Sequence, residues 1–480
     1  MEQKNDPDIG KVTRRQALGA GAGLLLGGRV GIAIPFDMDM KVLEVRTSYE
    51  DYHYRTPYKF GGVVVDKVTL LNVHVRASGR YGQMAEGFGS MPLGNAWSFP
   101  SQKLTYDQTL TAMRGLAEKI AAITGKLNEW GHPIDLNVTL EPEYFKAAQE
   151  LSRDMAEPIP PLCTIVTASP FDAAMHDAYG KLHRQNCFQT LGPLFMRYDL
   201  AHYLGPEFKG EKLDLYIPPQ PTQQLPLYHS VGASDPITDA DVKEKIGDGL
   251  PETLPEWIRY NGITHIKIKL IGNDRDWDMD RVIGVHQAAM STGRADFVYS
   301  LDFNEKCPNV AYLLDFLHNL KQRSADAFGR IQYVEQPTAR DLKAHPDDDV
   351  HEAAKLVPVV IDESLTGIDA FLLALKMGYS GAAIKACKGQ SMSLLIAAQA
   401  IKRNVFLCAQ DLTCPGASLV HSVTLAAHIP GVKGIEANAR EYVPAANAGW
   451  ERRFPGIFNV RDGEVRTFGT QGPGLGVIPL

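Results

Sequence analysis

The feature of this sequence that most constrains its fold is a series of short apolar runs in its C-terminal half. Each pair of runs is separated by a segment long enough for one helix. Eight strands that alternate with helices are expected for a (β/α)₈ barrel. The candidate strands are residues 225–229, 266–270, 297–301, 331–334, 357–361, 382–385, 405–407 and 432–435.

The chain is long enough for a barrel and a second domain, since it has 480 residues, of which 44% are apolar. Residues 41–100 are rich in β-branched side chains, while 106–124 and 143–156 have helical spacing. This order predicts an α+β domain over 41–190. A proline-rich stretch near residue 220 predicts a linker over 191–225, followed by the barrel over 226–444.

The N-terminus carries two adjacent arginines, Arg14 and Arg15, before a stretch rich in glycine and alanine. This pattern is similar to a twin-arginine export signal and predicts a leader over residues 1–40 and a periplasmic or exported protein. The apolar stretch is too short to span a membrane. The alternative is a basic, disordered N-terminus on a cytoplasmic protein.

Composition argues against two other classes of protein. The net charge is −7 and there is no basic stretch, so we expect no nucleic-acid partner. The six cysteines form no C-x-x-C pair, so neither a zinc site nor a disulfide framework is indicated. Buried thiols are the simpler interpretation.

Three successive runs end in an acidic residue: Asp302, Glu335 and Asp362. Chemistry in such barrels occurs at the carboxyl ends of the strands, and adjacent strands lie about 5 Å apart. Carboxylates that close repel each other unless a cation lies among them. One such acid could be a helix N-cap. Three in a row predict a Mg²⁺ site, since oxygen ligands suit this ion.

Lysines occupy the runs on either side of these acids. Lys267 and Lys269 alternate with isoleucines, so both point to the same face, and Lys385 ends the sixth run. We expect Lys269 and Lys385 to flank the metal from opposite sides. Burial and nearby positive charge lower a lysine pKa, which would allow one amine to act as a base. Lys267 is expected to bind the substrate carboxylate.

These motifs, in this order, resemble the muconate lactonizing enzyme group of the enolase superfamily. Lys267-Ile268-Lys269 resembles the K-x-K motif of that group, and Lys385 resembles its opposing lysine. The acids resemble its three metal ligands: Asp302 with Asn304 two residues later, Glu335-Gln336-Pro337 and Asp362-Glu363-Ser364. The resemblance implies a Mg²⁺-dependent enzyme on a barrel with an N-terminal capping domain.

The N-terminal half resembles the same family. Residues 55–62 are similar to its mobile capping loop, which implies that Tyr58 and Phe60 contact substrate. Residues 169–178 resemble the helix that joins cap to barrel. The resemblance also implies that 445–480 return to the capping domain. The segment 87–97 lies where the family has a short G-x-G-E-like stretch, and no role is assigned to it.

The seventh and eighth runs depart from related groups. The seventh has no histidine, which argues against a His–Asp base of the mandelate racemase type. Asp411, just after this run, is either a substrate contact or an N-cap. Glu436 and Asn438 loosely resemble the D-x-D motif with which dipeptide epimerases hold the substrate ammonium, so Glu436 is a candidate substrate contact.

Together these residues predict an isomerase, meaning a racemase, epimerase or cycloisomerase. It would remove the α-proton of a small carboxylate substrate through a metal-stabilised enediolate, with Lys269 and Lys385 as acid/base pair. Two alternatives stay open: a lyase resembling o-succinylbenzoate synthase, and a non-catalytic binding protein on the same fold. We also expect a homo-oligomer without stable membrane insertion. The substrate does not follow from the sequence.

Overall fold

A computed structural model describes residues 36–477, so the leader expected over 1–40, with Arg14 and Arg15, lies almost entirely outside the described residues. Eight parallel strands follow one another around a sheet that closes where the last strand pairs with the first. The predicted (β/α)₈ barrel is therefore confirmed. The strands are β4 (Gln224–Val231), β5 (His265–Lys269), β6 (Val298–Asp302), β7 (Ile331–Glu335), β8 (Val359–Ile361), β9 (Gly381–Ile384), β10 (Phe406–Ala409) and β11 (Ile435–Glu436).

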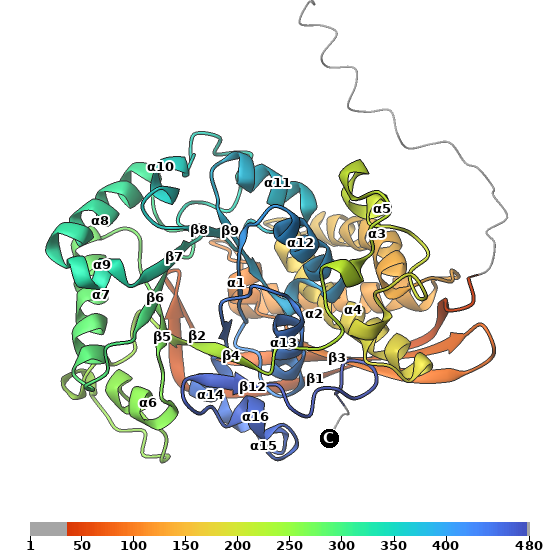
Figure 1. The fold of residues 1–480 in the computed structure, drawn as a ribbon, viewed down its shortest axis with the longest axis horizontal. Helices are drawn as coiled ribbons and strands as arrows, with labels where there is room; N and C mark the ends of the chain where they lie inside the picture. The colour runs from red at the N-terminus through yellow and green to blue at the C-terminus, as the bar shows by residue number, and fades with distance from the viewer. Residues whose placement is uncertain (1–35, 478–480) are drawn as a thin grey trace, which may run out of the picture. The chain divides into compact units, whose positions relative to one another are not determined.

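Helices connect successive strands, and Figure 1 shows α7 to α11 along the outer side of the barrel. In α8, Asn309 caps the N-terminus by accepting a backbone hydrogen bond, and Leu313, Leu317 and Leu320 bury one face. The helices are α6 (Leu254–Asn261), α7 (Arg275–Met290), α8 (Val310–Arg323), α9 (Ala325–Gly329), α10 (His351–Ala354), α11 (Ile368–Lys376), α12 (Gln390–Lys402) and α13 (Ala417–His428), with short turns η4 (Asp239–Asp241) and η5 (Ala386–Lys388).

The N-terminal part, here called the cap (β1 to α4), is an antiparallel sheet in the order β1-β2-β3 with helices against it. Buried side chains such as Val73, Leu116 and Phe171 join the sheet to the helices. Its elements are β1 (Met40–Phe60), β2 (Val63–Gly79), β3 (Met84–Pro92), α1 (Asn95–Ser98), α2 (Tyr106–Gly125), α3 (Pro133–Ser152) and α4 (Pro161–His183).

Two segments of the cap differ from their expected form. The helix expected over 143–156 begins ten residues earlier, as α3, because Pro133 fits the first helical turn and the helix continues through Pro142. Residues 55–60, expected as a loop, are the end of strand β1, and the hairpin turns at Gly61 and Gly62, both with positive φ.

The segment between cap and barrel packs on α12, where Lys402 binds the Glu211 carboxylate at 2.8 Å. It contains η1 (Cys187–Thr190), α5 (Ala201–Leu204), η2 (Pro206–Phe208) and η3 (Leu213–Leu215). After β11, the chain forms α14 (Ala439–Tyr442), η6 (Pro444–Asn447), α15 (Trp450–Arg453), α16 (Pro455–Phe458) and β12 (Glu464–Arg466).

The C-terminal segment contacts both halves of the molecule. Strand β12 pairs antiparallel with the first residues of β4, while β11 pairs with β4 further along, at Leu227 and Tyr228. Beyond β12, the backbone N–H of Leu475 donates to Asp177 of α4 at 2.8 Å.

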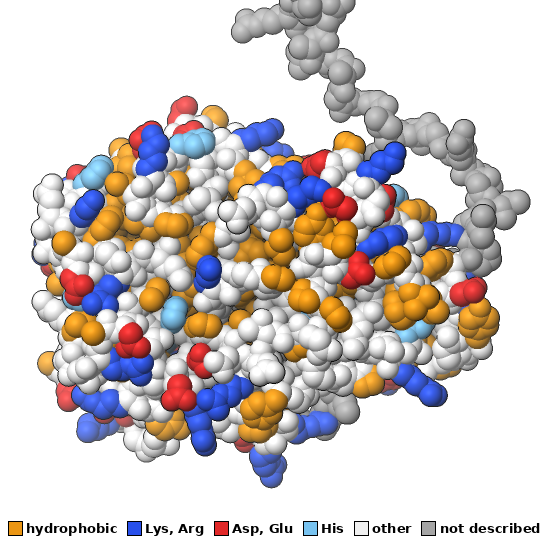
Figure 2. Space-filling model, in the orientation of Figure 1, with side chains coloured by type: hydrophobic (Ala, Val, Ile, Leu, Met, Phe, Trp, Pro, Cys, Tyr) orange, Lys and Arg blue, Asp and Glu red, His pale blue; other side chains and the backbone are white. Residues whose placement is uncertain are grey.

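All six cysteines are buried and free. Within residues 36–477, no helix has both the length and the apolar character that crossing a membrane requires. On the face shown in Figure 2, acidic and basic side chains are interspersed around apolar ones.

Candidate active site

The strand register places the three predicted acidic side chains at one end of the barrel, here called the barrel mouth. Lys269 of β5 pairs in register with Asp302 of β6, and Asp302 pairs with Glu335 of β7. Asp362 follows the last residue of β8. The three acids are at most 1% exposed. Carboxylates buried to this degree need counter-charges or must be protonated.

Lys267 lies among these acids. Its Nζ is 3.0 Å from a carboxylate oxygen of Asp302 and 3.0 Å from one of Glu335. Glu436 lies at 3.1 Å, and the side-chain oxygen of Gln410 also accepts a hydrogen bond from this amine. Burial opposes the charge, but the carboxylates raise the pKa of Lys267 well above its ordinary value. Lys267 is therefore a fixed ammonium ion.

The two predicted acid/base lysines contact different acids. Lys269 Nζ lies 2.5 Å from Asp302 Oδ2, whereas Lys385 Nζ lies 2.9 Å from Asp362 Oδ2. Lys385 also donates to the backbone carbonyl of Asp411 at 3.3 Å. Strand β5 and strand β9, which Lys385 follows, are four places apart in the eight-stranded closed sheet. The two amines therefore come from opposite walls of the barrel.

The pKa of Lys385 is raised above its ordinary value. Burial lowers it, but the carboxylates of Asp362 and Glu335 raise it above its ordinary value. The contacts with these acids therefore outweigh burial at Lys385.

The acids are affected unequally. Burial raises the pKa of Asp302, but the ammonium groups of Lys269 and Lys267 outweigh it and lower that pKa to about 2. Burial and the charge of Asp302 raise the pKa of Glu335 well above its usual range. Of the three acids, Glu335 is thus the one whose charged form is least stabilised.

Two side chains at this site were missed by the sequence analysis. Lys388 donates to Asp362 Oδ1 at 2.9 Å, because the 3₁₀ turn η5 places residues three apart on the same side. Gln410, which follows β10, donates to Glu335 Oε2 at 2.5 Å. The spacing from Lys385 was the available signal for Lys388. For Gln410, the only signal in the sequence was that this strand lacks the histidine found in the mandelate racemase group.

Asn304 links two acidic strand ends. Its φ of 43° is in the left-handed region, which asparagine tolerates. Its backbone N–H donates to Asp302 Oδ1 at 2.8 Å, and its side-chain amide donates to Glu363 Oε1 at 3.0 Å. Among the described residues, Asn304 Oδ1 and Glu363 Oε2 are buried without a hydrogen-bond partner. These oxygens remain able to accept from a bound group.

Asp411 and Glu436 take different positions. The Asp411 carboxylate accepts backbone hydrogen bonds from Thr413, Cys414 and Asn438 at 3.1, 3.3 and 3.0 Å. These bonds favour the capping role over substrate contact. Burial and the charge of Glu436 raise the pKa of Asp411 to about 7. Glu436 binds Lys267, as described above.

The cap covers the mouth with aromatic side chains. Lys269 Nζ lies 6.0 Å from the ring centre of Tyr58 and 5.7 Å from that of Phe60. The Tyr58 hydroxyl is 2.8 Å from Ser230 Oγ of β4, which fixes the hairpin to the barrel. A cavity of about 580 Å³ lies beside this hairpin. Its lining includes Phe60, Asn95, Trp97, Asn304, Lys306 and Glu363.

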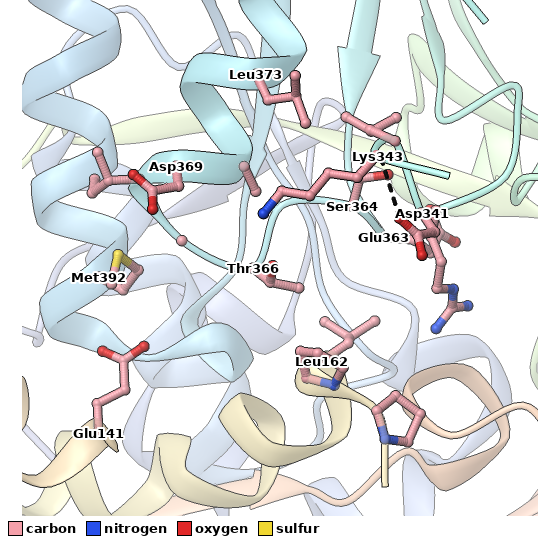
Figure 3. A pocket seen from close by; sticks show the side chains of 17 residues that line it. Glu141, Leu162, Asp341, Lys343, Glu363, Ser364, Thr366, Asp369, Leu373 and Met392 are labelled. Carbon is pink, nitrogen blue, oxygen red and sulfur yellow. Dashed lines mark hydrogen bonds between the residues drawn. The ribbon is translucent and has the colours of Figure 1, made fainter. Parts of the chain in front are cut away.

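A second cavity, of about 650 Å³, shares Arg340 and Glu363 with the first. Figure 3 shows Glu141 and Met392 on one side of it and Leu162 and Glu363 on the other. Neither cavity is lined by the three lysines predicted from sequence. Only the first is lined by Phe60, Trp97 and Asn304, which contact groups of the barrel mouth, so the first cavity is the better candidate for substrate.

The cluster fits a divalent cation by its chemistry and charge. Six carboxylates and four amines are buried in and beside it, which is a formal excess of two negative charges when every group is counted as ionised. Within the described residues, no three acidic, histidine or cysteine side chains are arranged to hold an ion. The lysine amines lie between the acids instead. The carboxylates are Asp302, Glu335, Asp362, Glu363, Asp411 and Glu436, and the amines are Lys267, Lys269, Lys385 and Lys388.

Solved structures resemble this fold over nearly the whole chain. A dipeptide epimerase from Enterococcus faecalis, complexed with Mg and the dipeptide L-Leu-L-Tyr, is 16% identical with a TM-score of 0.58, covering 91% of this chain and 99% of its own. A 2-chloromuconate cycloisomerase from Rhodococcus opacus is 18% identical with a TM-score of 0.59, covering 91% and 96%. An N-succinyl Arg/Lys racemase from Bacillus cereus is 17% identical with a TM-score of 0.61, covering 92% and 96%.

No curated protein matches the sequence. Residues 250–479 match the sequence model of a family described as enolase C-terminal domain-like. This region contains the strands that carry all three acids and all four buried lysines of the barrel mouth. The barrel half of the chain, residues 250–479, thus matches the enolase C-terminal domain-like family, and the similar structures share the fold of the whole chain.

Proposed function

We propose that this protein is an isomerase that removes and returns the α-proton of a carboxylate substrate. Asp302, Glu335 and Asp362 would hold Mg²⁺, and Lys269 and Lys385 would be the acid/base pair. One observation carries the proposal. The two amines come from strands four apart in the barrel, and each lies against a different acid of the same buried cluster.

The α-proton of a carboxylate is a weak acid, so its removal needs a nearby base and positive charge beside the carboxylate. When bound, Mg²⁺ supplies that charge. Lys269 takes the proton from one face of the α-carbon. Lys385, which neighbouring carboxylates hold protonated, returns a proton to the opposite face. Lys267 keeps the acids in place as a permanent ammonium ion.

The comparisons support this class of reaction. The similar structures named above are an epimerase, a cycloisomerase and a racemase, and the epimerase was solved with Mg and a dipeptide. The cavity of about 580 Å³ would hold a substrate of drug-like size, since ligand pockets measure roughly 300–1,000 Å³.

The test is a screen of carboxylates, including N-acyl amino acids and dipeptides, for uptake of solvent deuterium at the α-carbon in the presence of Mg²⁺. Lys269→Ala and Lys385→Ala should each slow full turnover by about 10²–10⁴-fold. Each variant should keep exchange on the face that its remaining lysine serves. Lys376→Ala, which removes an exposed lysine of α11, is the matched control and should turn over at the wild-type rate.

Other outcomes would contradict the proposal. Loss of water from the substrate, without exchange into recovered substrate, would indicate a lyase. Binding without Mg²⁺ dependence and without exchange would indicate a binding protein. Full activity in Lys385→Ala would exclude the two-lysine mechanism.

We also propose that the protein is exported through the twin-arginine route. The support is the pair Arg14-Arg15 before the Gly/Ala-rich stretch. Replacing both with lysine should leave the protein in the cytoplasmic fraction, whereas an unchanged distribution in fractionated cells would contradict export by this route.

A further inference from the structure

The segment 87–97 brings the cap sheet close to the barrel mouth. Its first part, in β3, lies directly on helix α4 because two positions lack a side chain. A Cβ at Gly87 would lie 2.0 Å from the Ala174 carbonyl oxygen, and one at Gly89 would lie 2.0 Å from that of Pro170. Only glycine allows this approach.

The second part turns sharply into helix α1. Gly94 has φ of 56° and precedes the helix, and a Cβ there would lie 2.4 Å from Leu412, in the loop after β10. The turn therefore packs against a barrel loop as well as against the cap. Trp97, three residues later, is consequently directed into the barrel mouth.

Trp97 contacts the site through its ring, its indole N–H and its backbone. The ring centre lies 4.3 Å from Lys385 Nζ, and Nε1 donates to Glu363 Oε1 at 2.9 Å. Its carbonyl oxygen accepts from Arg340 at 3.2 Å. The residue is 5% exposed. A cap residue is thus fixed to three barrel residues.

We propose that Trp97 is a positioning residue for Lys385, whose amine it holds through its ring face and shields from water. The catalytic importance of this contact rests on the proposed function, whereas the contact between Trp97 and Lys385 is independent of that function. The opposite amine is held differently. Lys269 has its nearest ring centre at 5.7 Å, so the two faces of the site differ in how firmly aromatic contact fixes the amine.

A cation–π contact at a buried site corresponds to about 0.5–2 kcal/mol, which is roughly a 2- to 30-fold change in an equilibrium or a rate. Trp97→Leu removes the ring and the indole N–H. Trp97→Phe keeps a ring and removes only the N–H to Glu363. The pair therefore separates the aromatic contact from the hydrogen bond.

The first measurement needs no substrate. The intact protein is treated with N-hydroxysuccinimide acetate, and acetylation of each lysine is followed by peptide mass spectrometry. Trp97→Leu should raise the labelling rate of Lys385 about tenfold and leave Lys269 unchanged, while Trp97→Phe should stay close to wild type. Unchanged labelling of Lys385 in Trp97→Leu would overturn the proposal, as would an equal rise at Lys269.

The second measurement uses the carboxylate that shows α-proton exchange in the screen above. Trp97→Leu should slow exchange on the Lys385 face about tenfold and leave exchange on the Lys269 face within twofold. An equal loss on both faces would show a general structural role and overturn the proposal. If no carboxylate exchanges at all, the proposed function fails, and the labelling experiment still decides the role of Trp97.

Discussion

The barrel mouth and the contact between helices α4 and α12 both bury ionisable groups, but the pKa values of these groups are shifted by different causes. At the mouth, acids and amines are in direct contact, and the pKa of Asp302 falls to about 2. Between the helices, Ser391 Oγ donates to Asp172 Oδ1 at 2.7 Å and lies 2.9 Å from His176 Nε2. Burial there raises the pKa of Asp172 to about 6 and lowers that of His176 to about 3.

The difference shows what keeps a buried group charged in this protein. Burial alone pushes both Asp172 and His176 toward their neutral forms, because the neutral hydroxyl between them does not compensate a charge. At Asp302 and Asp362 of the mouth, direct contacts with ammonium groups outweigh the same burial. The mouth can therefore keep the charged groups that catalysis needs, whereas the helix contact serves to join cap and barrel.

The largest expected effect comes from removing one charge without changing shape. Asp362→Asn should lower turnover about 10³-fold or more, since stabilisation by a bound metal is worth several kcal/mol. Asp172→Asn, the same change at the helix contact, should stay within about tenfold of wild type. Exchange kinetics and calorimetric Mg²⁺ titration of both variants measure the contrast. Comparable losses would show that the helix contact also takes part in the chemistry.

Removing the central amine should cost stability. Lys267→Met leaves Asp302, Glu335 and Glu436 without this counter-charge, and breaking a buried ion pair costs about 3–5 kcal/mol. Urea unfolding without metal measures the loss. Mg²⁺ at about 100 times its dissociation constant should restore about 2.7 kcal/mol. Lys376→Met is the surface control. If Lys267→Met loses no more unfolding free energy than this control, the mouth does not need Lys267 for charge balance.

The helix contact should show opposing effects of pH. His176 has a lowered pKa in the fold, so its contribution is lost as pH falls from about 6.5 toward about 3. Asp172 has a raised pKa, so stability from this group grows as pH falls from about 6 toward about 4. Between pH 7 and pH 4, the free energy of unfolding of Asp172→Asn should therefore fall by about 2 kcal/mol more than that of wild type.

The free energy of unfolding of His176→Gln should fall less than that of wild type over the same pH range. Urea unfolding at a series of pH values checks both signs, and identical pH curves for the two variants would contradict the assignment.

The smallest effect is expected for Ser391→Ala. It removes the hydroxyl between the two groups but keeps the backbone N–H of residue 391, which donates to Asp172 Oδ2 at 2.7 Å. The expected loss is about 1 kcal/mol, the usual net value of one hydrogen bond. A thermal scan against wild type measures it, and a loss comparable to that of Lys267→Met would place a charged pair at this contact after all.

The sequence predicted the barrel because each strand is a short apolar run whose end is marked by a polar residue. Asp302, Glu335 and Lys269 follow from that pattern alone, since strand period and register determine where their side chains point. The contacts between these acids and the lysine amines did not follow from the pattern. Which amine contacts which acid depends on distances of about 1 Å, which no pattern of residue types contains.

The cap contribution was outside the reach of sequence reasoning. Trp97 and Lys385 are far apart in the chain and meet only because β3 docks on α4 through Gly87 and Gly89. The start of helix α3 was missed for a local reason, since the helix begins with Pro133 and contains a second proline, Pro142, and proline inside a segment normally predicts a helix boundary. Long-range docking and irregular helix starts both leave weak periodic signals.

The pairing of β12 with β4 has a consequence for the integrity of the closed sheet. Strand β11 is only two residues long, and it leaves the first residues of β4 to be paired by Glu464–Arg466. The parallel pairing of β11 with β4 that closes the barrel is thus extended, at the start of β4, by the antiparallel strand β12. A chain ending before residue 464 would leave the amide and carbonyl groups at the start of β4 unpaired, and such an open edge invites strand exchange between molecules and aggregation.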